Sequence, residues 1–399
     1  MNRRCCGPLA WLLLALLPCA ANADDAPRIA PLASPVTVRL RGLSAVSEDI
    51  AWASGQAGTV LRSTDGGKSW SVMHVPGAES LDLRDVHGFS AQAAVVMGAG
   101  PGDASRVFRT SDGGARWSEV LRNPDPAGFF DCIDFDGERG VLLGDPVDGR
   151  FRIFRSRDAG RTWVAGIGPR AVDGEAAFAA SGTCVLLAGG GTLVATGGSR
   201  ARVHYLPQRF EAQGDWQAID AAFPEPAASA GLFSLARRDA TVVAVGGDFR
   251  KPAAPAIVAS VRATATTAGR DKVRFQSWPQ FLGTPAGYRS GLACEQRKDP
   301  VCIATGPDAN DVLTTTDAGP LRWTPLPGRG HDSAGHDSVG KDSVGKDSVG
   351  KDSVGKGSVG YDSVANAGRV FWFSGEGGRL GRLVLPIAAP ERVPPQHRR

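Results

Sequence analysis

The stretch RSTDGGKSW at residues 62–70 decides the fold, because two close copies of it follow in the chain. These are RTSDGGARW at residues 109–117 and RSRDAGRTW at residues 155–163, so that the copies are spaced by 47 and then 46 residues. A fixed period of this size indicates a supersecondary unit that is repeated along the chain.

Each copy combines residues that favour a tight turn. An Asp side chain can accept hydrogen bonds from the backbone N–H groups just ahead of it, a Gly supplies the positive φ that the turn needs, and a Trp can fill the space beneath it. Strand-like runs flank every copy, for example GTVL (58–61) before the first and WSVMHV (70–75) after it. We therefore expect structural β-hairpin corners, and we assign this role to Asp65, Trp70, Asp112, Trp117, Asp158 and Trp163.

The third copy matches a known pattern at every position. Residues 156–163, SRDAGRTW, resemble the Asp-box or BNR repeat, S-x-D-x-G-x-T-W, of sialidases and other β-propellers. Residues 49–70 resemble more closely the repeat of the plant photosystem II stability/assembly factor family and its bacterial relatives. Residues 129–154 and 230–249 resemble the exported bacterial branch of these propellers, whose members often carry the labels oxidoreductase or glycosyl hydrolase. The resemblance implies the fold and says little about function.

The remaining Trp residues extend the repeat along the chain. Trp216, Trp278 and Trp323 continue the series, and TTTDAGPLRW (314–323) is a degenerate fourth box with Asp317 as its acid. A last strand pair at residues 369–385 lacks an outer strand, which the extended segment at residues 27–40 can supply. We predict an all-β, seven-bladed β-propeller closed by pairing of the N- and C-terminal strands, with six or eight blades as the alternatives.

The N-terminus has the features of an export signal. Arg3 and Arg4 precede an apolar run at residues 9–17, and Ala21-Asn22-Ala23 forms an A-x-A cleavage site. The apolar run is too short to span a membrane. We expect a signal peptide at residues 1–23, a periplasmic or secreted location, and one propeller domain at residues 24–399. The net charge of +4 gives no indication of nucleic-acid binding.

Four cysteines remain after cleavage, and an even number in an exported chain suggests disulfide bonds. Cys294 and Cys302 flank EQRKDPV, a predicted hairpin loop, and can face each other across two strands. Cys132 and Cys184 are expected in neighbouring blades, with buried free thiols as the alternative. Neither the cysteine spacing nor the scattered histidines predict a metal site.

Residues 331–365 consist of a pentapeptide in seven copies, HDSAG HDSVG KDSVG KDSVG KDSVG KGSVG YDSVA. One Val in five residues cannot bury a core. We expect a flexible surface loop at residues 331–360, with a short stacked β-like ladder as the alternative, and expect the last copy to lead into the final blade.

The predicted functional surface is the end of the central channel where the innermost strands start, because the loops between second and third strands share that face. The starts of the innermost strands place Arg84, Asp131, Glu175, Tyr288 and Arg289 there, and the loops add Asp145, Asp148, Arg150, Asp248 and Glu376. These ten residues are the candidate ligand-binding set. The alternative is that they hydrogen-bond turn backbones or pair with one another.

Two classes of function follow from this set. The first is an exported binding or assembly scaffold, expected to be a monomer, with an unidentified protein or carbohydrate ligand. The second is a carbohydrate-active hydrolase or lyase that uses the carboxylates, which would require a pair about 5–10 Å apart in a cleft. Residues 151–154, FRIF, are similar to a sialidase motif but have Phe where Pro is expected. No G-x-G-x-x-G follows a strand, so we expect no nucleotide cofactor and lean against an enzyme.

Overall fold

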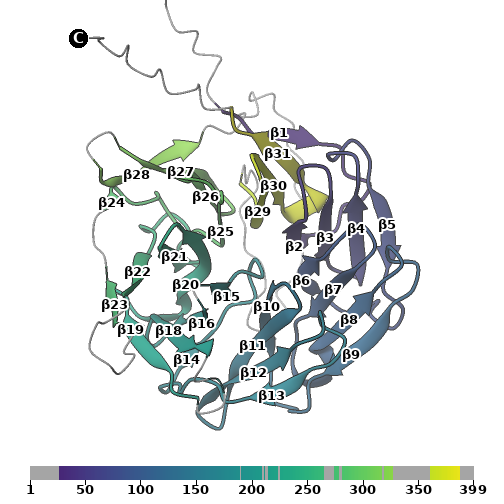
Figure 1. The fold of residues 1–399 in the computed structure, drawn as a ribbon, viewed down its shortest axis with the longest axis horizontal. Coiled ribbons are helices and arrows are strands. Elements are labelled where there is room, and N and C mark those ends of the chain that lie inside the picture. The colour runs from purple at the N-terminus through teal and green to yellow at the C-terminus, as the bar shows by residue number, and fades with distance from the viewer. Residues whose placement is uncertain are drawn as a thin grey trace, which may run out of the picture.

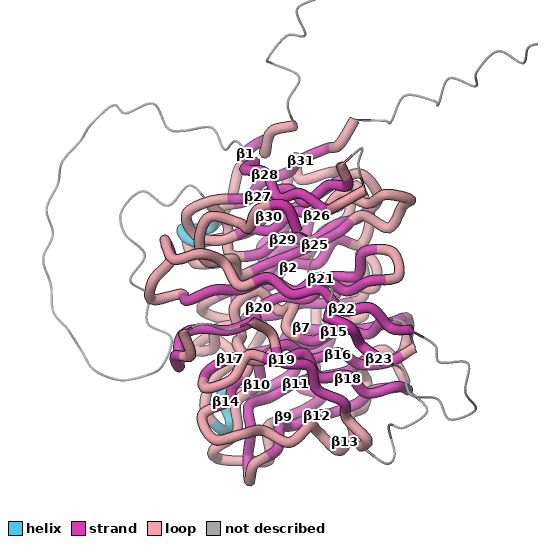
Figure 2. The backbone as a smooth tube through the Cα atoms, turned by 90° about the vertical axis from the view of Figure 1, so that its left-hand side faces the viewer, coloured by secondary structure: helices cyan, strands magenta, loops and turns pink. Residues whose placement is uncertain are grey.

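The computed structural model describes residues 27–188, 190–208, 211, 214–222, 225–264, 274–277, 281–316, 319–326 and 360–386. Seven sheets of mainly antiparallel strands stand around a central channel like the blades of a propeller (Figure 1). Seen from the side, the ring is a disc crossed by strands, and little of the chain is helical (Figure 2). The predicted fold class, with seven blades, is confirmed.

The blades follow one another along the chain. Blade 1 is β2 (Leu40–Ala45), β3 (Ala51–Gly55), β4 (Thr59–Ser63) and β5 (Ser71–His74). Blade 2 is β6 (Leu83–Gly88), β7 (Ala94–Gly98), β8 (Arg106–Thr110) and β9 (Ser118–Arg122). Blade 3 is β10 (Phe130–Asp136), β11 (Arg139–Val147), β12 (Arg150–Ser156) and β13 (Val164–Gly166). Blade 4 is β15 (Val185–Ala188), β16 (Gly191–Ala195), β18 (Arg202–Pro207) and β19 (Gln217–Asp220).

Blades 5 and 6 carry additional short strands. Blade 5 is β20 (Ala227–Arg238), β21 (Thr241–Asp248), β22 (Val258–Thr264) and β23 (Arg274–Ser277), extended by β17 (Gly197–Gly198) and β14 (Glu175–Ala176). Blade 6 is β25 (Gly291–Cys294), β26 (Cys302–Thr305), β27 (Asn310–Thr315) and β28 (Leu321–Leu326), with β24 (Phe281–Leu282) parallel to β28. Blade 7 is β29 (Ser363–Ala367), β30 (Val370–Ser374), β31 (Leu380–Val384) and β1 (Ala30–Leu32). Short 3-10 helices follow β7 and β30, η2 (Gly102–Ala104) and η4 (Glu376–Gly378).

The two ends of the described chain close the ring, as predicted. β1 pairs antiparallel with β31, with Ala30 opposite Arg382 and Leu32 opposite Leu380, and the two strands lie side by side in Figure 1. Ile29 is buried in one cluster with Tyr361, Phe373 and Leu383. The N-terminal segment therefore supplies the outer strand of blade 7 and covers the edge that β31 would otherwise expose.

The repeated stretch forms the turn between the third and fourth strands of blades 1 to 3. In the third copy, Asp158 Oδ1 accepts the N–H groups of Arg161 (3.0 Å) and Thr162 (2.9 Å), and Asp158 Oδ2 accepts the Thr162 hydroxyl (2.7 Å). The Ser156 hydroxyl donates to Asp158 and accepts the Gly160 N–H. Asp65 and Asp112 accept the N–H groups of Ser69 and Arg116 in the same way.

The Arg that opens each copy links neighbouring blades. Arg62 Nη1 donates to the carbonyl oxygen of Gly113 (2.9 Å) in the turn of blade 2, and Arg109 Nε donates to that of Ala159 (3.0 Å) in the turn of blade 3. The next Arg, Arg155, donates from Nη1 to Glu211 Oε1 (3.2 Å), which lies between the third and fourth strands of blade 4. The repeat is therefore a contact between blades as well as a turn.

Several expectations fall outside the described residues, namely the signal peptide, residues 331–359 of the pentapeptide tract, Trp278 and Asp317. Trp216 precedes β19 as the box Trp residues precede their fourth strands, whereas Trp323 lies inside β28. Gly360 is buried and its N–H donates to the carbonyl oxygen of Pro307 (2.9 Å). Gly360, the last residue of the predicted loop, therefore packs against blade 6, and the boundary of the loop stays a prediction.

Candidate functional site

We call the end of the central channel where the innermost strands start the mouth. β-Bulges lie in several innermost strands near this end and direct side chains toward it. The pairing register shifts around Arg41 in β2, Arg84 in β6, Asp131 in β10 and Phe233 in β20, which are innermost strands. A bulge inserts one extra residue and changes the direction of its side chain. A bulge therefore places one residue of each of these blades around the mouth.

Ion pairs between blades occupy much of one side of the mouth. Arg39 Nε and Nη2 donate to the two carboxylate oxygens of Asp362 (2.7 and 2.9 Å), which joins blade 1 to blade 7. Asp82 Oδ2 accepts from Arg41 Nη1 (2.5 Å) and Arg84 Nε (2.9 Å), which joins blade 1 to blade 2. Bidentate and shared arginine–carboxylate pairs fix the geometry of both partners.

Two carboxyl groups, those of Asp131 and Asp145, lie where blade 3 meets this network. Asp131 is 1% exposed, and its Oδ2 has no hydrogen-bond partner among the described residues, as is also true of Asp82 Oδ1. Burial raises the pKa of Asp131 well above its usual range, and the charge of Asp145 adds to this while Arg84 opposes it. Burial raises the pKa of Asp145 to about 6, although its Oδ1 accepts the Ala177 N–H (2.9 Å).

The opposite side of the mouth is aromatic. Phe178 stacks on Phe233 with ring centroids 4.0 Å apart, and Tyr288 meets Phe233 edge-on at 4.8 Å. Beside them Arg289 is 1% exposed and its Nε donates to Asp311 Oδ2 (2.6 Å). Burial raises the pKa of the Tyr288 phenol, so Tyr288 is neutral and serves as packing surface.

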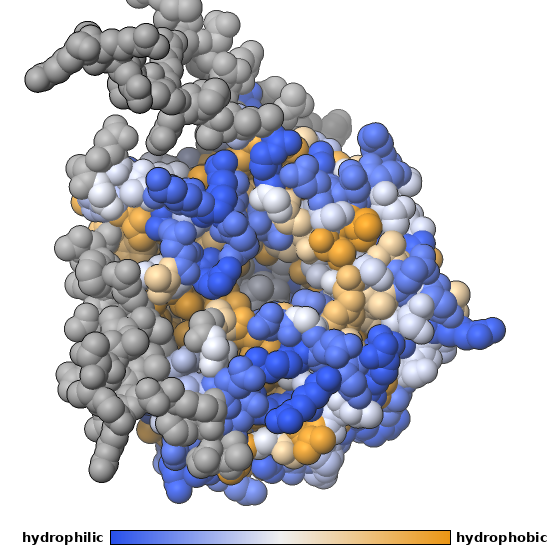
Figure 3. Space-filling view, in the orientation of Figure 1, coloured by the Kyte–Doolittle hydropathy of each residue, from blue (hydrophilic) through white to orange (hydrophobic). Residues whose placement is uncertain are grey.

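Residues 177–184 lie across the channel. The Ser181 hydroxyl donates to the carbonyl oxygen of Ser290 in blade 6 (2.6 Å), and Thr183 Oγ1 lies 2.6 Å from Ser234 Oγ in blade 5. Gly182 has φ +75°, and a Cβ there would lie 2.2 Å from Asp85 Oδ1 in blade 2, so only glycine fits. The segment is rich in Ala, Ser and Gly, which suits a narrow channel. Figure 3 shows the hollow at the centre of one face of the ring.

Glu175 is buried and not a solvated rim residue, which fits the alternative that the candidates bind turn backbones or neighbouring side chains. Its carboxylate accepts from Arg202 Nε (2.9 Å), the Thr196 hydroxyl (2.6 Å) and the Val172 N–H (3.0 Å), and it lies 3.0 Å from His204 Nε2. Burial opposes ionisation of Glu175, but these hydrogen bonds outweigh it and lower the pKa to about 2. Arg289 is buried in the same way, so it is not a solvated rim residue either.

The other candidates lie in exposed turns or fasten loops. Asp148 (φ +55°) and Gly149 (φ +72°) form the tight turn between β11 and β12, and Arg150 Nη1 donates to the carbonyl oxygen of Gly168 (2.9 Å). Asp248 accepts the Arg250 N–H (2.9 Å), and Glu376 is exposed in η4. Of the ten candidates, the structure brings together Arg84, Asp131 and Asp145.

Both cysteine pairs are joined in the structure. Cys294 and Cys302 are opposite residues of β25 and β26, with Cα atoms 4.0 Å apart. Cys132 and Cys184 have Cα atoms 5.8 Å apart and connect β10 to the end of the segment that crosses the channel. The second bond therefore anchors the floor of the mouth to blade 3.

The described residues indicate neither a metal centre nor a membrane span. Within the described ranges, no three His, Cys, Asp or Glu side chains are placed to hold a metal ion. In that same part of the chain, no helix has the length and apolar character needed to cross a bilayer.

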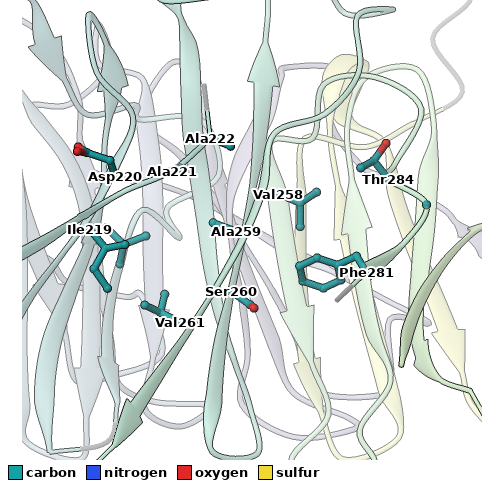
Figure 4. Close-up of a pocket in the computed structure, with 12 residues that line it drawn as sticks. Ile219, Asp220, Ala221, Ala222, Val258, Ala259, Ser260, Val261, Phe281 and Thr284 are labelled. Carbon is teal, nitrogen blue, oxygen red and sulfur yellow. The ribbon is translucent and has the colours of Figure 1, made fainter. Parts of the chain in front are cut away.

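A pocket of about 270 Å³ lies away from the mouth, between the outer parts of blades 4 and 5, and is lined by Ile219, Val258, Val261 and Phe281 (Figure 4).

Sequence reasoning missed several residues that shape the mouth. Arg39, Asp82 and Asp311 are ion-pair partners of mouth residues, and Phe178 and Phe233 supply its aromatic side. Arg39 and Asp82 precede Arg41 and Arg84 by two residues, a repeated spacing at the start of β2 and β6 that was available as a signal. The pairing of Arg289 with Asp311, in a different strand, had no such signal.

Comparison with known proteins shows the fold. No family model matches the chain, and no curated protein is similar to it in sequence. Among solved structures, YCF48 bound to a D1 peptide has a TM-score of 0.56 at 14% identity and covers 91% of this chain and 97% of its own. Selenomethionine-substituted virginiamycin B lyase from Staphylococcus aureus also reaches 0.56 at 14% identity, covering 90% and 99%. YCF48 from Cyanidioschyzon merolae has a TM-score of 0.51 at 14% identity, covering 89% and 98%. At this identity the likeness is one of fold alone.

Proposed function

We propose that this protein is an exported binding scaffold that holds a protein partner against the mouth of its propeller. The observation that carries the proposal is that charged mouth residues are paired across blades, as Arg39 is with Asp362 and Arg41 with Asp82. Such pairs hold the rim in one geometry before any partner arrives, which lowers the cost of ordering it on binding.

The floor of the mouth supports the same role. Residues 177–184 lie across the channel and are held through Cys184 and through the Ala177 N–H, so the mouth is a concave surface on one face of the ring. A peptide is bound by YCF48, a propeller of similar fold. We extend peptide or protein binding to this chain as a proposal that rests on its own rigid, polar and aromatic rim.

The alternative function, a carbohydrate-active hydrolase or lyase, depends on Asp131 and Asp145. Burial raises the pKa of Asp131 well above its usual range and leaves the residue only 1% exposed, so a glycosidic oxygen has little access to it. One oxygen of Asp145, whose pKa is about 6, is already bound by the Ala177 N–H. The neighbouring carboxylates Asp82 and Asp362 are already bound to arginines. This pairing favours the scaffold.

The proposal is tested by capturing partners on the immobilised protein and measuring the affinity of the purified partner for variants. Arg84→Gln changes a half-buried residue of the mouth, and Glu376→Arg changes an exposed one. The control is Lys68→Glu, which changes an exposed residue in the box turn of blade 1. We expect both mouth variants to weaken binding and the control to keep it, while melting curves show that each variant is folded.

Two results would contradict the scaffold. A partner that tolerates both mouth changes but is lost with Lys68→Glu would place binding on the other face. Release of reducing ends from an oligosaccharide library, abolished by Asp131→Asn, would establish the enzymatic alternative.

A further inference from the structure

Blade 5 lacks the tryptophan that blades 1 to 4 place against their preceding neighbour. In blades 1 to 4, the residue directly before the fourth strand is a tryptophan, namely Trp70, Trp117, Trp163 or Trp216. Each of them packs against the apolar cluster that its own blade forms with the preceding one. In blade 5 the residue directly before β23 is Val273. The apolar cluster between blades 4 and 5 contains no tryptophan among its described members.

The pocket of about 270 Å³ lies at the interface where this tryptophan is missing (Figure 4), and we call it the rim pocket. Val203 and Ile219 line it from blade 4, and Ala259 and Val261 of β22 line it from blade 5. All four side chains belong to the apolar cluster between these blades or pack against it. Phe281 of β24 adds an aromatic ring to the wall.

The position of the rim pocket corresponds to that of the Trp216 indole between blades 3 and 4. Trp216 Nε1 donates to the carbonyl oxygen of Ile167 (2.8 Å), which is the first residue after β13, the fourth strand of blade 3. The first residue after the fourth strand of blade 4 is Ala221, and it lines the rim pocket. An indole combines an apolar ring with one N–H donor, so it suits an apolar wall beside backbone carbonyls. The rim pocket therefore has the form of an indole site to which blade 5 brings no tryptophan at the position before its fourth strand.

The rim pocket is open to solvent. Asp220, Ala222, Gly283 and Thr284 line it and are all exposed, so a ligand can enter from the outer rim of the disc. A small molecule is usually enclosed over most of its surface by its binding site. An open pocket of this kind instead suits a side chain that stays attached to a polypeptide outside.

We infer that the rim pocket receives the indole ring of a tryptophan side chain of a partner protein. The inference goes beyond the proposed function, because it adds a second contact on the rim, away from the mouth. Val203, Ile219 and Val261 offer this ring the kind of apolar contact between blades that Trp216 finds one blade earlier. Tryptophan is among the residues that most often dominate the binding energy of a protein interface, because its ring buries a large apolar area in a pocket.

The probes are acetylated and amidated glycine pentapeptides with a central Trp or Ala, together with free indole, titrated into the full folded protein in a calorimeter. Ala259→Leu places a larger side chain in the rim pocket, and Ala115→Leu makes the same change at an exposed position in the box turn of blade 2. We expect the Trp peptide to bind saturably and the Ala peptide not to bind. Ala259→Leu should weaken binding of the Trp peptide at least about tenfold, because the added methyl groups occupy the space of the ring, while Ala115→Leu keeps the affinity.

Ala222→Leu, at the exposed edge of the rim pocket, is a second variant that should weaken binding, and melting curves show whether each variant is folded. A further variant, Trp278→Ala, tests whether this chain's own tryptophan, three residues before Phe281, takes the site. The inference is overturned if the Trp peptide does not bind to the wild type, whether or not free indole binds, or if Ala259→Leu and Ala115→Leu behave alike. It is also overturned if only Trp278→Ala binds the Trp peptide, because that result would assign the rim pocket to Trp278.

Discussion

At the scale of single residues, each box Asp is a hydrogen-bond hub for its own turn. Asp158 accepts two N–H groups and the hydroxyl of Thr162, and Asp65 similarly accepts the N–H and hydroxyl of Ser69. Asp112 has Arg116 at the equivalent position and so accepts no hydroxyl there. These bonds lower the pKa of all three carboxyl groups, to about 2 for Asp65 and Asp158.

This difference predicts an order of stability losses. Asp158→Ala should lower the free energy of unfolding by roughly 1–2 kcal/mol, because the turn loses several charge-assisted hydrogen bonds that water partly replaces. Asp112→Ala should cost less, because fewer bonds are removed. Urea unfolding at pH 7 measures both losses, and an equal or larger loss for Asp112→Ala would show that these bonds do not set the stability of the turns.

Glu175 is the buried counterpart of these exposed acids. It holds Arg202, His204 and Thr196 together on blade 4. Glu175→Ala should lower the free energy of unfolding by about 2–4 kcal/mol, because it leaves the half-buried Arg202 and the buried His204 without their carboxylate. Since the folded pKa of Glu175 is below its unfolded value of 4.5, its contribution is fully present above about pH 4.5 and disappears as the pH falls toward 2. Thermal melts from pH 2 to 7 test this, and a variant as stable as wild type at pH 7 contradicts it.

At the scale of strands, the innermost strands are joined by side chains that accept backbone N–H groups of the next blade. Asp85 in β6 accepts the Ile133 N–H of β10 (2.7 Å), and Asp134 in β10 accepts the Leu187 N–H of β15 (2.7 Å). Burial raises the pKa of both, to about 7 for Asp134. Contacts between blades therefore depend on one buried and one half-buried acid whose environments favour the protonated form.

Asp134 predicts a pH dependence. Its folded pKa lies above the unfolded value of about 4, so the folded state takes up a proton and stability falls as pH rises from 4 to 7. Asp134→Asn keeps an acceptor oxygen and should remove about 1–3 kcal/mol of this decline. Melting temperatures between pH 4 and 8 measure it, with the exposed Asp173→Asn as control. A profile of Asp134→Asn that parallels wild type would rule the assignment out.

The strands and turns could be predicted from the sequence, but only some of the contacts between blades could. The period of Arg62, Arg109 and Arg155 predicted the blades and the turn positions, because each box is a local structure that depends on nearby residues. The proximity of Arg84 and Asp131 could be predicted, because the two residues occupy equivalent positions in successive blades. The burial of Glu175 could not be predicted, because its partners Arg202 and His204 lie in a blade without a recognisable box and are contacts formed only by folding.

At the scale of the whole molecule, the ring is closed by three residues of β1 together with Ile29. Ala30, Pro31 and Leu32 pair with β31, and Ile29 is buried with Tyr361 and Phe373. Without this strand, β31 would present a free edge to other chains.

Deletion of residues 24–32 should therefore lower stability and promote association. Loss of the buried Ile29 alone should remove about 1.5–3 kcal/mol. Denaturant unfolding and light scattering measure the two effects, and Arg28→Ala, which keeps the strand, is the control. A monomeric deletion variant with unchanged stability would show that β1 does not close the ring.

The central claim is that the partner sits on the mouth, and photo-crosslinking measures this most directly. A photoreactive residue is placed singly at four exposed positions, Asp148 and Glu376 in turns on the mouth face and Lys68 and Glu138 in turns on the other face. With the captured partner, we predict crosslinks from Asp148 and Glu376 and background levels from Lys68 and Glu138. Crosslinks confined to Lys68 and Glu138 would contradict the account.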